Sequence, residues 1–201
     1  PFSQFRQFIE TLTEFKKDFI IIGNTNSLTY KELFPLIRED KARTGYTNFN
    51  TGMFFEIPDY YDKYHHIENG KKIARVASSC WITTLPVSKH KEFLTLYKKY
   101  KPEDFIKYDN YDAIEVSQVA NIPMDYAGHM GVPITFVDKY NPDQFEIIGF
   151  THRNDPYNLK TKIYTKADGD NFNDLNGSPI IMENGQAKFI YMRIIIKNKK
   201  L

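Results

Sequence analysis

The sequence predicts an α/β fold at the N-terminal end of the chain, and three observations support this prediction. Apolar residues recur at three- and four-residue intervals over residues 5–15, the period of a helix with one apolar face. The apolar, largely β-branched run 19–22 ends at Gly23 and predicts a strand buried on both faces. Thr29, with Glu32 three residues later, predicts the capping box of a second helix. Helix, buried strand and helix in this order indicate a three-layer α/β sheet.

The rest of the chain is predicted to be rich in strands. A third helix is expected over residues 89–100, where apolar side chains lie on one side. The three strands before it are expected to be antiparallel and to close the first sheet. A final hairpin is expected around Asn184-Gly185, because Asn-Gly is a strong signal for a two-residue turn. The expected strands are 53–57, 73–76 and 80–82 in the first half, and 113–116, 132–137, 145–150 and 163–165 in the second.

Composition limits the class of protein. The 201 residues are 41% hydrophobic and 15% aromatic, which is enough apolar material for a folded core. A net charge of +2 does not by itself indicate a protein that binds nucleic acid. The apolar runs are too short to span a bilayer, so we expect no membrane association and a cytoplasmic location. Cys80 has no second cysteine to pair with, and the five histidines lack zinc-site spacing, so neither a disulfide nor a metal is expected.

Blocks of sequence spread along most of the chain share the residue pattern of one known family. They are residues 1–6, 19–24, 29–37, 44–50 and 52–61 in the first half, and 108–116, 130–136 and 138–149 in the second. These blocks resemble EcoRI-type adenine-specific DNA methyltransferases. The resemblance implies that residues 1–100 form the C-terminal half of a Rossmann-like S-adenosylmethionine-dependent methyltransferase sheet. It also implies that residues 101–201 form a β-rich extension that recognises the DNA target.

The resemblance places the first residues inside a catalytic motif. Many amino-methyltransferases carry Asn-Pro-Pro-Phe at the end of a strand, and Pro1-Phe2 looks like the second half of it. By the family pattern, Phe2 stacks on an adenine that has been flipped out of the duplex. The asparagine and first proline of the motif, and the glycine-rich loop that holds most of the cofactor, would precede Pro1. The chain is therefore expected to be incomplete and inactive alone.

Polar residues after the predicted strands are candidates for substrate binding. Asn24 and Asn26 follow the buried strand at its carboxyl end, where open α/β sheets place their ligands. Turn formation explains these two asparagines equally well. Thr47, Asn48 and Asn50 lie between aromatic residues and suit contacts to a base or phosphate, although an Asx-rich turn is the alternative.

Basic residues in the second half are candidates for contacts to DNA. Arg153, Lys160 and Lys162 are expected to reach phosphates or the major groove, with a solvated surface as the alternative. The resemblance implies a site-specific methyltransferase that takes S-adenosylmethionine as cofactor and double-stranded DNA as partner, in restriction-modification. Two alternatives stay open, a non-catalytic DNA-binding module derived from such an enzyme and an RNA methyltransferase.

Overall fold

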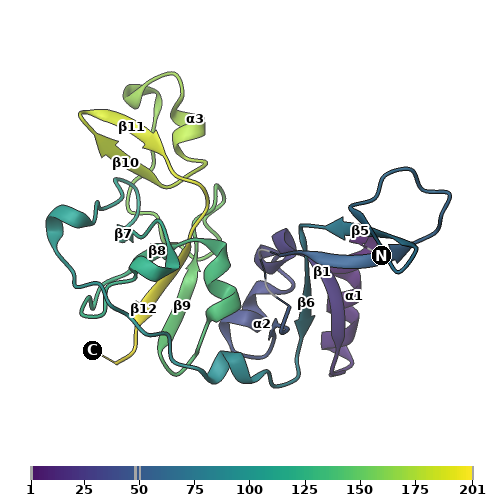
Figure 1. Cartoon of the computed structure of the whole chain (residues 1–201). Coiled ribbons are helices and arrows are strands. Elements are labelled where there is room, and N and C mark those ends of the chain that lie inside the picture. Colours follow the sequence, from purple (N-terminus) through teal and green to yellow (C-terminus); the bar gives the residue numbers. More distant parts are fainter. Residues whose placement is uncertain (1, 48, 50, 201) are drawn as a thin grey trace. The chain divides into compact units, whose positions relative to one another are not determined.

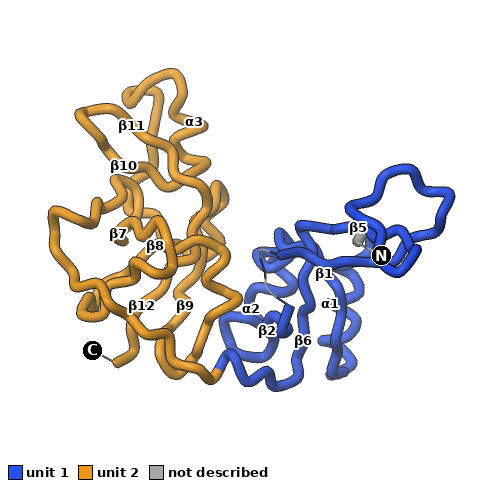
Figure 2. Tube along the Cα trace, viewed as in Figure 1, with its two compact units in different colours: residues 1–90 blue, residues 91–201 orange. Residues whose placement is uncertain are grey.

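The computed structural model describes residues 2–47, 49 and 51–200, and the side chain of Phe2 lies outside the described part. The chain forms two compact units, residues 1–90 and residues 91–201, which Figure 2 colours separately. Both units mix helices with several small sheets, as the labels of Figure 1 indicate, so the expected α/β character is confirmed. Within the described residues, no helix combines the length and the apolar character needed to cross a membrane.

The first predicted helix is confirmed as α1 (Phe5–Glu14). Its apolar face buries Phe5 and Ile9, which repeat at the four-residue interval of a helix. The stripe is wider than the buried face, because Phe8 and Phe15 are 49% and 64% exposed. A sequence pattern therefore identifies this helix correctly and overstates how much of it is covered.

A small antiparallel sheet in unit 1 follows the helix. β1 (Ile20–Asn24) pairs antiparallel with β6 (Ser79–Thr83), and β6 pairs antiparallel with β2 (Arg43–Thr44). The strand order is β1-β6-β2, so β1 lies at an edge of the sheet. The expectation that this strand is buried on both faces is wrong, since Ile20 is 59% exposed. Only the Gly23 position is tightly covered, by the side chains of α1 and β6.

The second predicted helix exists but begins later than its predicted cap. α2 (Phe34–Arg38) starts with Pro35 in its first turn, where the fixed φ of proline suits a helix. The Thr29 hydroxyl instead donates to the carbonyl of Asn26, within the 3-10 helix η2 (Thr25–Thr29). The predicted capping box is therefore wrong. The local hydrogen bond to Asn26 competed with it, as threonine side chains commonly do near turns.

The next three strands form a separate sheet. β3 (Met53–Ile57) pairs with β5 (Lys71–Val76), and β5 pairs with β4 (His66–Glu68), so the order is β3-β5-β4. The expectation that 53–57 and 73–76 close the first sheet is therefore wrong, while 80–82 joins it as part of β6. The tight Asn69-Gly70 turn, with positive φ at both residues, folds β4 directly back onto β5. We call the segment 53–77 the β-arm.

Unit 2 is built on a four-stranded sheet of order β7-β8-β12-β9. Its core includes Phe136 and Phe145, both fully buried, whose rings meet edge to face at 5.2 Å between centroids. β7 and β8 are parallel, whereas β12 is antiparallel to β8 and to β9. The strands are β7 (Ile114–Glu115), β8 (Met130–Val132), β9 (Phe145–Phe150) and β12 (Ile194–Asn198).

Some predicted elements of the second half are confirmed and others are wrong. The strand at 145–150 and the hairpin at Asn184-Gly185 are present, the hairpin as β10 (Ile180–Glu183) and β11 (Gln186–Phe189). The predicted helix over 89–100 is wrong, since residues 88–91 form a short 3-10 helix, residues 92–100 contain no helix, and Phe93 and Tyr97 are 50% and 83% exposed. Residues 134–139 form a 3-10 helix instead of extending a strand, and 163–165 is irregular.

Short helices connect these elements. They are η1 (Phe2–Gln4), η3 (Ser88–Lys91), η4 (Pro102–Asp104), η5 (Val119–Asn121), η6 (Ile134–Lys139), η7 (Lys166–Asp168) and α3 (Phe172–Leu175). In η7, Thr165 and Asp168 form a complete capping box, which is the motif expected at Thr29 and not found there.

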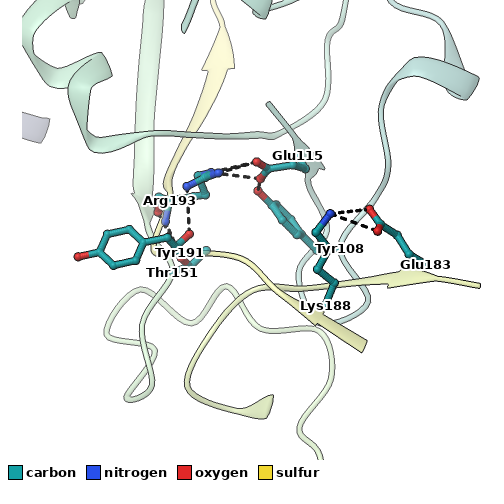
Figure 3. Close-up of polar contacts among 7 residues, drawn as sticks. All are labelled: Tyr108, Glu115, Thr151, Glu183, Lys188, Tyr191 and Arg193. Carbon is teal, nitrogen blue, oxygen red and sulfur yellow. Dashed lines mark hydrogen bonds and ion pairs between the residues drawn. The ribbon is translucent and has the colours of Figure 1, made fainter. Parts of the chain in front are cut away.

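A buried polar cluster joins β7 to the start of β12 in unit 2 (Figure 3). The Arg193 guanidinium donates from Nη2 and Nε to the Glu115 carboxylate, at 2.6 and 3.1 Å, and both side chains are only 12% exposed. The buried Tyr108 hydroxyl also donates to Glu115. Burial, and then the charge of Glu115, raises the pKa of Tyr108 above its ordinary value, so this hydroxyl stays protonated and remains a donor.

Candidate functional site

A pocket of about 220 Å³ lies where β1 ends and η2 begins in unit 1. It is lined by Phe5, Asn24, Asn26, Ser27 and Tyr30. The two asparagines that the sequence singled out therefore lie in one pocket, at the carboxyl end of a strand. Chain reversal at such an end exposes backbone and side-chain polar groups that the sheet does not use.

The Asn24 side chain is engaged in holding the turn that shapes this pocket. Its Oδ1 accepts from the backbone N–H of Asn26 at 2.9 Å, which makes Asn24 the N-cap of η2. Its Nδ2 donates to the Ser78 hydroxyl at 3.2 Å. The Asn26 side chain is exposed and lines the same pocket. Of the two asparagines, Asn26 is therefore the better placed to contact a ligand.

Ser27 is a functional candidate that sequence reasoning missed. Ser27 is 1% exposed, and its Oγ has no hydrogen-bond partner among the described residues. A buried hydroxyl without a partner is unfavourable by roughly 1–3 kcal/mol, so native structures rarely keep one. Because Ser27 also lines the pocket, a bound ligand can supply the missing partner. A serine inside a polar turn carries no sequence signal of this kind.

Gly23 brings Ser27 and α1 close together at the base of the pocket. A Cβ added at Gly23 would lie 2.9 Å from Phe5 Cε2 and 3.1 Å from Ser27 Oγ. It would also lie 2.6 Å from Ile82 Cδ1 on β6. Only glycine therefore permits this close approach of helix, strand and turn.

The rim of the pocket combines aromatic rings with a cation. The Tyr30 ring meets the Phe5 ring edge to face at 6.3 Å, and the Arg6 guanidinium lies 4.2 Å from the Tyr30 centroid. Arg6 also lies 3.9 Å from the largely buried carboxylate of Glu32, measured from Nε to Oε2. The arrangement offers rings, amide and hydroxyl groups to a planar, polar ligand such as a nucleobase.

Several other predicted residues cannot be assigned to this pocket. Pro1, the side chain of Phe2, Asn48 and Asn50 lie outside the described residues. Thr47 is described and half-buried after β2, and it is not among the described residues that line the pocket. For Phe2, the predicted stacking residue, the structure describes only the backbone. It lies in η1, the short helix directly before α1.

Lys160, one of the three predicted DNA contacts in unit 2, serves the fold. Its Nζ donates to the carbonyls of Arg153 and Asn176 at 2.8 and 2.7 Å. Burial lowers the pKa of this ammonium below its ordinary value. Asp155 accepts from the backbone N–H of Leu159 and Lys160, which closes the loop around the lysine.

The other two predicted contacts differ in how available their charges are. The Lys162 ammonium lies 2.6 Å from Asp109 Oδ2 and 4.6 Å from the centroid of the Tyr164 ring. Hydrogen bonds from Lys162 and Tyr164 hold the pKa of Asp109 below its ordinary value. Arg153 is 55% exposed in its side chain, and its guanidinium lies 3.8 Å from Asp174. Arg153 thus keeps the most accessible charge of the three.

No group of three or more histidine, cysteine, aspartate or glutamate side chains is arranged to hold a metal ion within the part of the chain that is described. The donor groups that come together at the β1 pocket are amides, a hydroxyl and an aromatic phenol. These are groups that hydrogen-bond and stack on organic ligands.

Comparison with known proteins agrees with the sequence resemblance. The profile of the family described as "Adenine-specific methyltransferase EcoRI" matches residues 1–199. Type II methyltransferase M.EcoRI of Escherichia coli is 39% identical, over 100% of this chain and 56% of that protein. M.MgeORF184P of Mycoplasma genitalium is 34% identical over 100% of the chain and 63% of the relative, and M.MpnI of Mycoplasma pneumoniae is 31% identical over 100% and 62%.

The match extends over the whole chain, and the chain spans little more than half the length of these curated relatives. No solved structure matches it. A family profile that covers residues 1–199 leaves almost no part of either unit unaccounted for. This chain belongs to the EcoRI family of adenine-specific methyltransferases.

Proposed function

We propose that the chain is the C-terminal part of a site-specific DNA methyltransferase. In the complete enzyme, a methyl group passes from S-adenosylmethionine to the exocyclic amine of adenine in a specific DNA sequence, in restriction-modification. Family membership and the names of the relatives, all Type II methyltransferases, support this proposal. At the level of individual residues, the proposal is supported by the pocket at the end of β1, where the Ser27 hydroxyl has no partner among the described residues.

Unit 1 then contributes the C-terminal half of a Rossmann-like sheet. β1 and β2 both run antiparallel to β6 and are therefore parallel to each other. Both pairings in this sheet are antiparallel, so the assignment rests on family membership and on the pocket rather than on the strand directions. The pocket at the carboxyl end of β1 supports this assignment, because open α/β sheets bind ligands in that position.

The residues of the pocket fit the polar edge and the ring of a purine. Asn26 and Ser27 offer an amide and a hydroxyl, while Phe5 and Tyr30 offer aromatic surface. Bound S-adenosylmethionine supplies the electrophilic methyl group, whereas the pocket supplies the polar groups and rings that suit a base. We therefore assign the β1 pocket to the adenine side of the reaction, and we propose Pro1 and Phe2 as catalytic residues on the family pattern alone.

Hydrogen bonds in this pocket orient the base. An acceptor such as the Asn26 side-chain oxygen holds an amine proton and so leaves the nitrogen lone pair directed at the methyl donor. An aromatic ring stacked on the flipped base contributes roughly 1–3 kcal/mol of binding. The β-rich extension, residues 101–201, is the proposed target-recognition region, with Arg153 as its most accessible candidate contact. Lys162 is a weaker candidate, because Asp109 already neutralises it.

The proposal is tested on the full-length protein with tritium-labelled S-adenosylmethionine and adenine-containing duplex DNA. We expect label in methylated adenine of the DNA. Incorporation into RNA instead would point to the RNA methyltransferase alternative. An isothermal titration in which the folded full-length protein binds DNA and shows no heat with S-adenosylmethionine would support the non-catalytic module.

Replacing Ser27 with alanine separates a ligand-binding hydroxyl from a merely structural one. We expect kcat/KM for DNA to fall roughly 2- to 12-fold, the equivalent of one hydrogen bond of about 0.5–1.5 kcal/mol. Stability is expected to stay the same or to rise, since an unpartnered buried hydroxyl is removed. Methylation rates at several DNA concentrations and urea unfolding measure the two effects.

Ser79 provides the matched control for this substitution. It is also 1% exposed in unit 1, but its hydroxyl donates to the Val76 carbonyl at 2.7 Å. Ser79→Ala is expected to lower the free energy of unfolding by about 0.5–1.5 kcal/mol with kcat/KM unchanged. Equal kinetics for wild type and Ser27→Ala would remove Ser27 from the site.

A further inference from the structure

The β-arm carries a second pocket, far from the end of β1 in sequence. Its volume is about 360 Å³, and it is lined by Lys63, Tyr64, His65, Ala74, Arg75 and Ala77. Among the described residues that line it, none is a carboxylate, whereas the lysine, the histidine and the arginine are nitrogen donors. A pocket that gathers donors and no acceptor side chain except a phenol suits an anion.

The arm divides its cations between its own fold and this pocket. Outside the pocket, Lys71 lies 2.8 Å from Glu56, and Lys72 donates to the carbonyls of Asp59 and Tyr61. At the pocket, Lys63 has no hydrogen-bond or ion-pair partner among the described residues. Lys71 and Lys72 are therefore engaged within the arm, whereas Lys63 of the pocket is not.

Arg75 is anchored in a way that leaves most of its donors available. Its Nε donates to the Thr51 carbonyl at 2.9 Å, which fixes the guanidinium beside β5, the central strand of the arm. The two terminal nitrogens have no partner among the described residues. A guanidinium presents its remaining donors in one plane, the geometry that binds two oxygens of a phosphate at once.

Exposed tyrosines lie on the loop between β3 and β4, which also carries Lys63 and Tyr64 of the pocket and stands out from the rest of unit 1 (Figure 1). Tyr60 is 77% exposed and Tyr61 51%, and their rings stack at 4.8 Å between centroids. The two hydrogen bonds from Lys72 go to backbone carbonyls of this loop and fix its backbone beside the two rings. Large aromatic side chains kept in water on an ordered loop mark a binding surface, and they pack well against sugars and bases beside phosphate contacts.

We propose that the β-arm binds the phosphate backbone of duplex DNA, with Lys63 and Arg75 contacting one phosphate in this pocket and the loop tyrosines packing beside it. The inference rests on the proposed function, which makes duplex DNA the polyanion that this chain meets. The arm has four Lys and Arg residues and four Asp and Glu residues over 53–77, so its net formal charge is zero. The pocket, and not the arm as a whole, therefore attracts the phosphate. Such contacts set affinity and register on the duplex without reading the sequence.

The salt dependence of DNA binding tests this proposal. The dissociation constant of the full-length protein for a duplex is measured by fluorescence anisotropy at several salt concentrations, for wild type, Lys63→Ala and Arg75→Ala. We expect weaker binding for both variants. The logarithm of the association constant falls linearly with the logarithm of the salt concentration. We expect this slope to become less steep by roughly 0.9 for each phosphate that a variant no longer neutralises.

Two further variants keep the test specific. Lys71→Ala removes a cation from the same arm that Glu56 already neutralises, and it is expected to leave the slope unchanged. Arg75→Lys keeps the charge without the planar fork, and it is expected to retain the slope while binding less tightly than wild type. If Lys71→Ala changes the slope as much as Lys63→Ala, the pocket has no special part in binding and the proposal is wrong.

Two other outcomes would also overturn it. Unchanged slopes in Lys63→Ala and Arg75→Ala would show that the arm touches no phosphate, and wild-type methylation of DNA in the same variants would leave the proposed function intact. Tighter binding of wild type to duplex RNA than to duplex DNA would assign the pocket to another polyanion. If wild type itself neither binds nor methylates DNA, it is the proposed function that fails, and the two failures are thereby distinguished.

Discussion

Replacing Arg193 with methionine is expected to destabilise unit 2 by about 3–5 kcal/mol. The substitution leaves the Glu115 carboxylate, 12% exposed, without the cation that lies 2.6 Å from it. Breaking a buried pair by removing one partner costs this much because the remaining charge is neither solvated nor neutralised. Figure 3 shows that Tyr108 donates to the same carboxylate, so its hydrogen bond is disturbed as well. Urea unfolding followed by tyrosine fluorescence and circular dichroism measures the loss of stability.

The hairpin offers an exposed ion pair as the control for this prediction. Lys188 lies 3.0 Å from Glu183, and both side chains are largely exposed, at 55% and 42%. Lys188→Ala is expected to change the free energy of unfolding by less than about 1 kcal/mol, because solvent already screens this pair. Replacing Glu115 and Arg193 together with leucine and methionine is expected to recover much of the stability. Equal small effects of Arg193→Met and Lys188→Ala would contradict a buried charge cluster.

Gly131→Ala is the second large effect, and it acts through the same cluster. A Cβ at this position on β8 would lie 2.7 Å from Tyr108 Cε2 and would also meet the phenol oxygen. The ring is buried and its hydroxyl is held by Glu115, so it cannot move aside without breaking that hydrogen bond. Overpacking of this kind is destabilising by about 1–3 kcal/mol, and the broken hydrogen bond adds to it.

A double-mutant cycle identifies the cause of the Gly131 effect. In a Tyr108→Ala background the ring is absent, and the alanine methyl at position 131 occupies part of the space it leaves. Gly131→Ala is therefore expected to cost clearly less there than in the wild-type chain. Thermal and urea unfolding of the four proteins provide the coupling free energy. Additive effects would mean that the backbone of β8, rather than the Tyr108 ring, requires glycine.

The sequence by itself determined the elements that depend on local pattern. α1 follows from apolar residues at helical spacing, and the β10–β11 hairpin follows from Asn184-Gly185, whose positive φ values other residues rarely adopt. Membership of the methyltransferase family also followed from sequence, because blocks along most of the chain resemble it, and the family profile matches residues 1–199. The same reasoning pointed to Asn24 and Asn26, which lie in one pocket because Asn24 ends β1 and Asn26 lies in η2, which directly follows that strand.

Only the tertiary structure decided which strands pair and which polar groups lack partners. Alternating apolar residues do not specify a partner strand, so the β-arm formed its own sheet where one continuous sheet was expected. Glu115 and Arg193 are 78 residues apart in sequence, and their pairing depends on β7 and β12 being brought together through β8. Among the described residues, the Ser27 hydroxyl and the Lys63 ammonium have no partner. The sequence cannot show this, because hydrogen bonding and burial depend on distant residues that only the fold brings close.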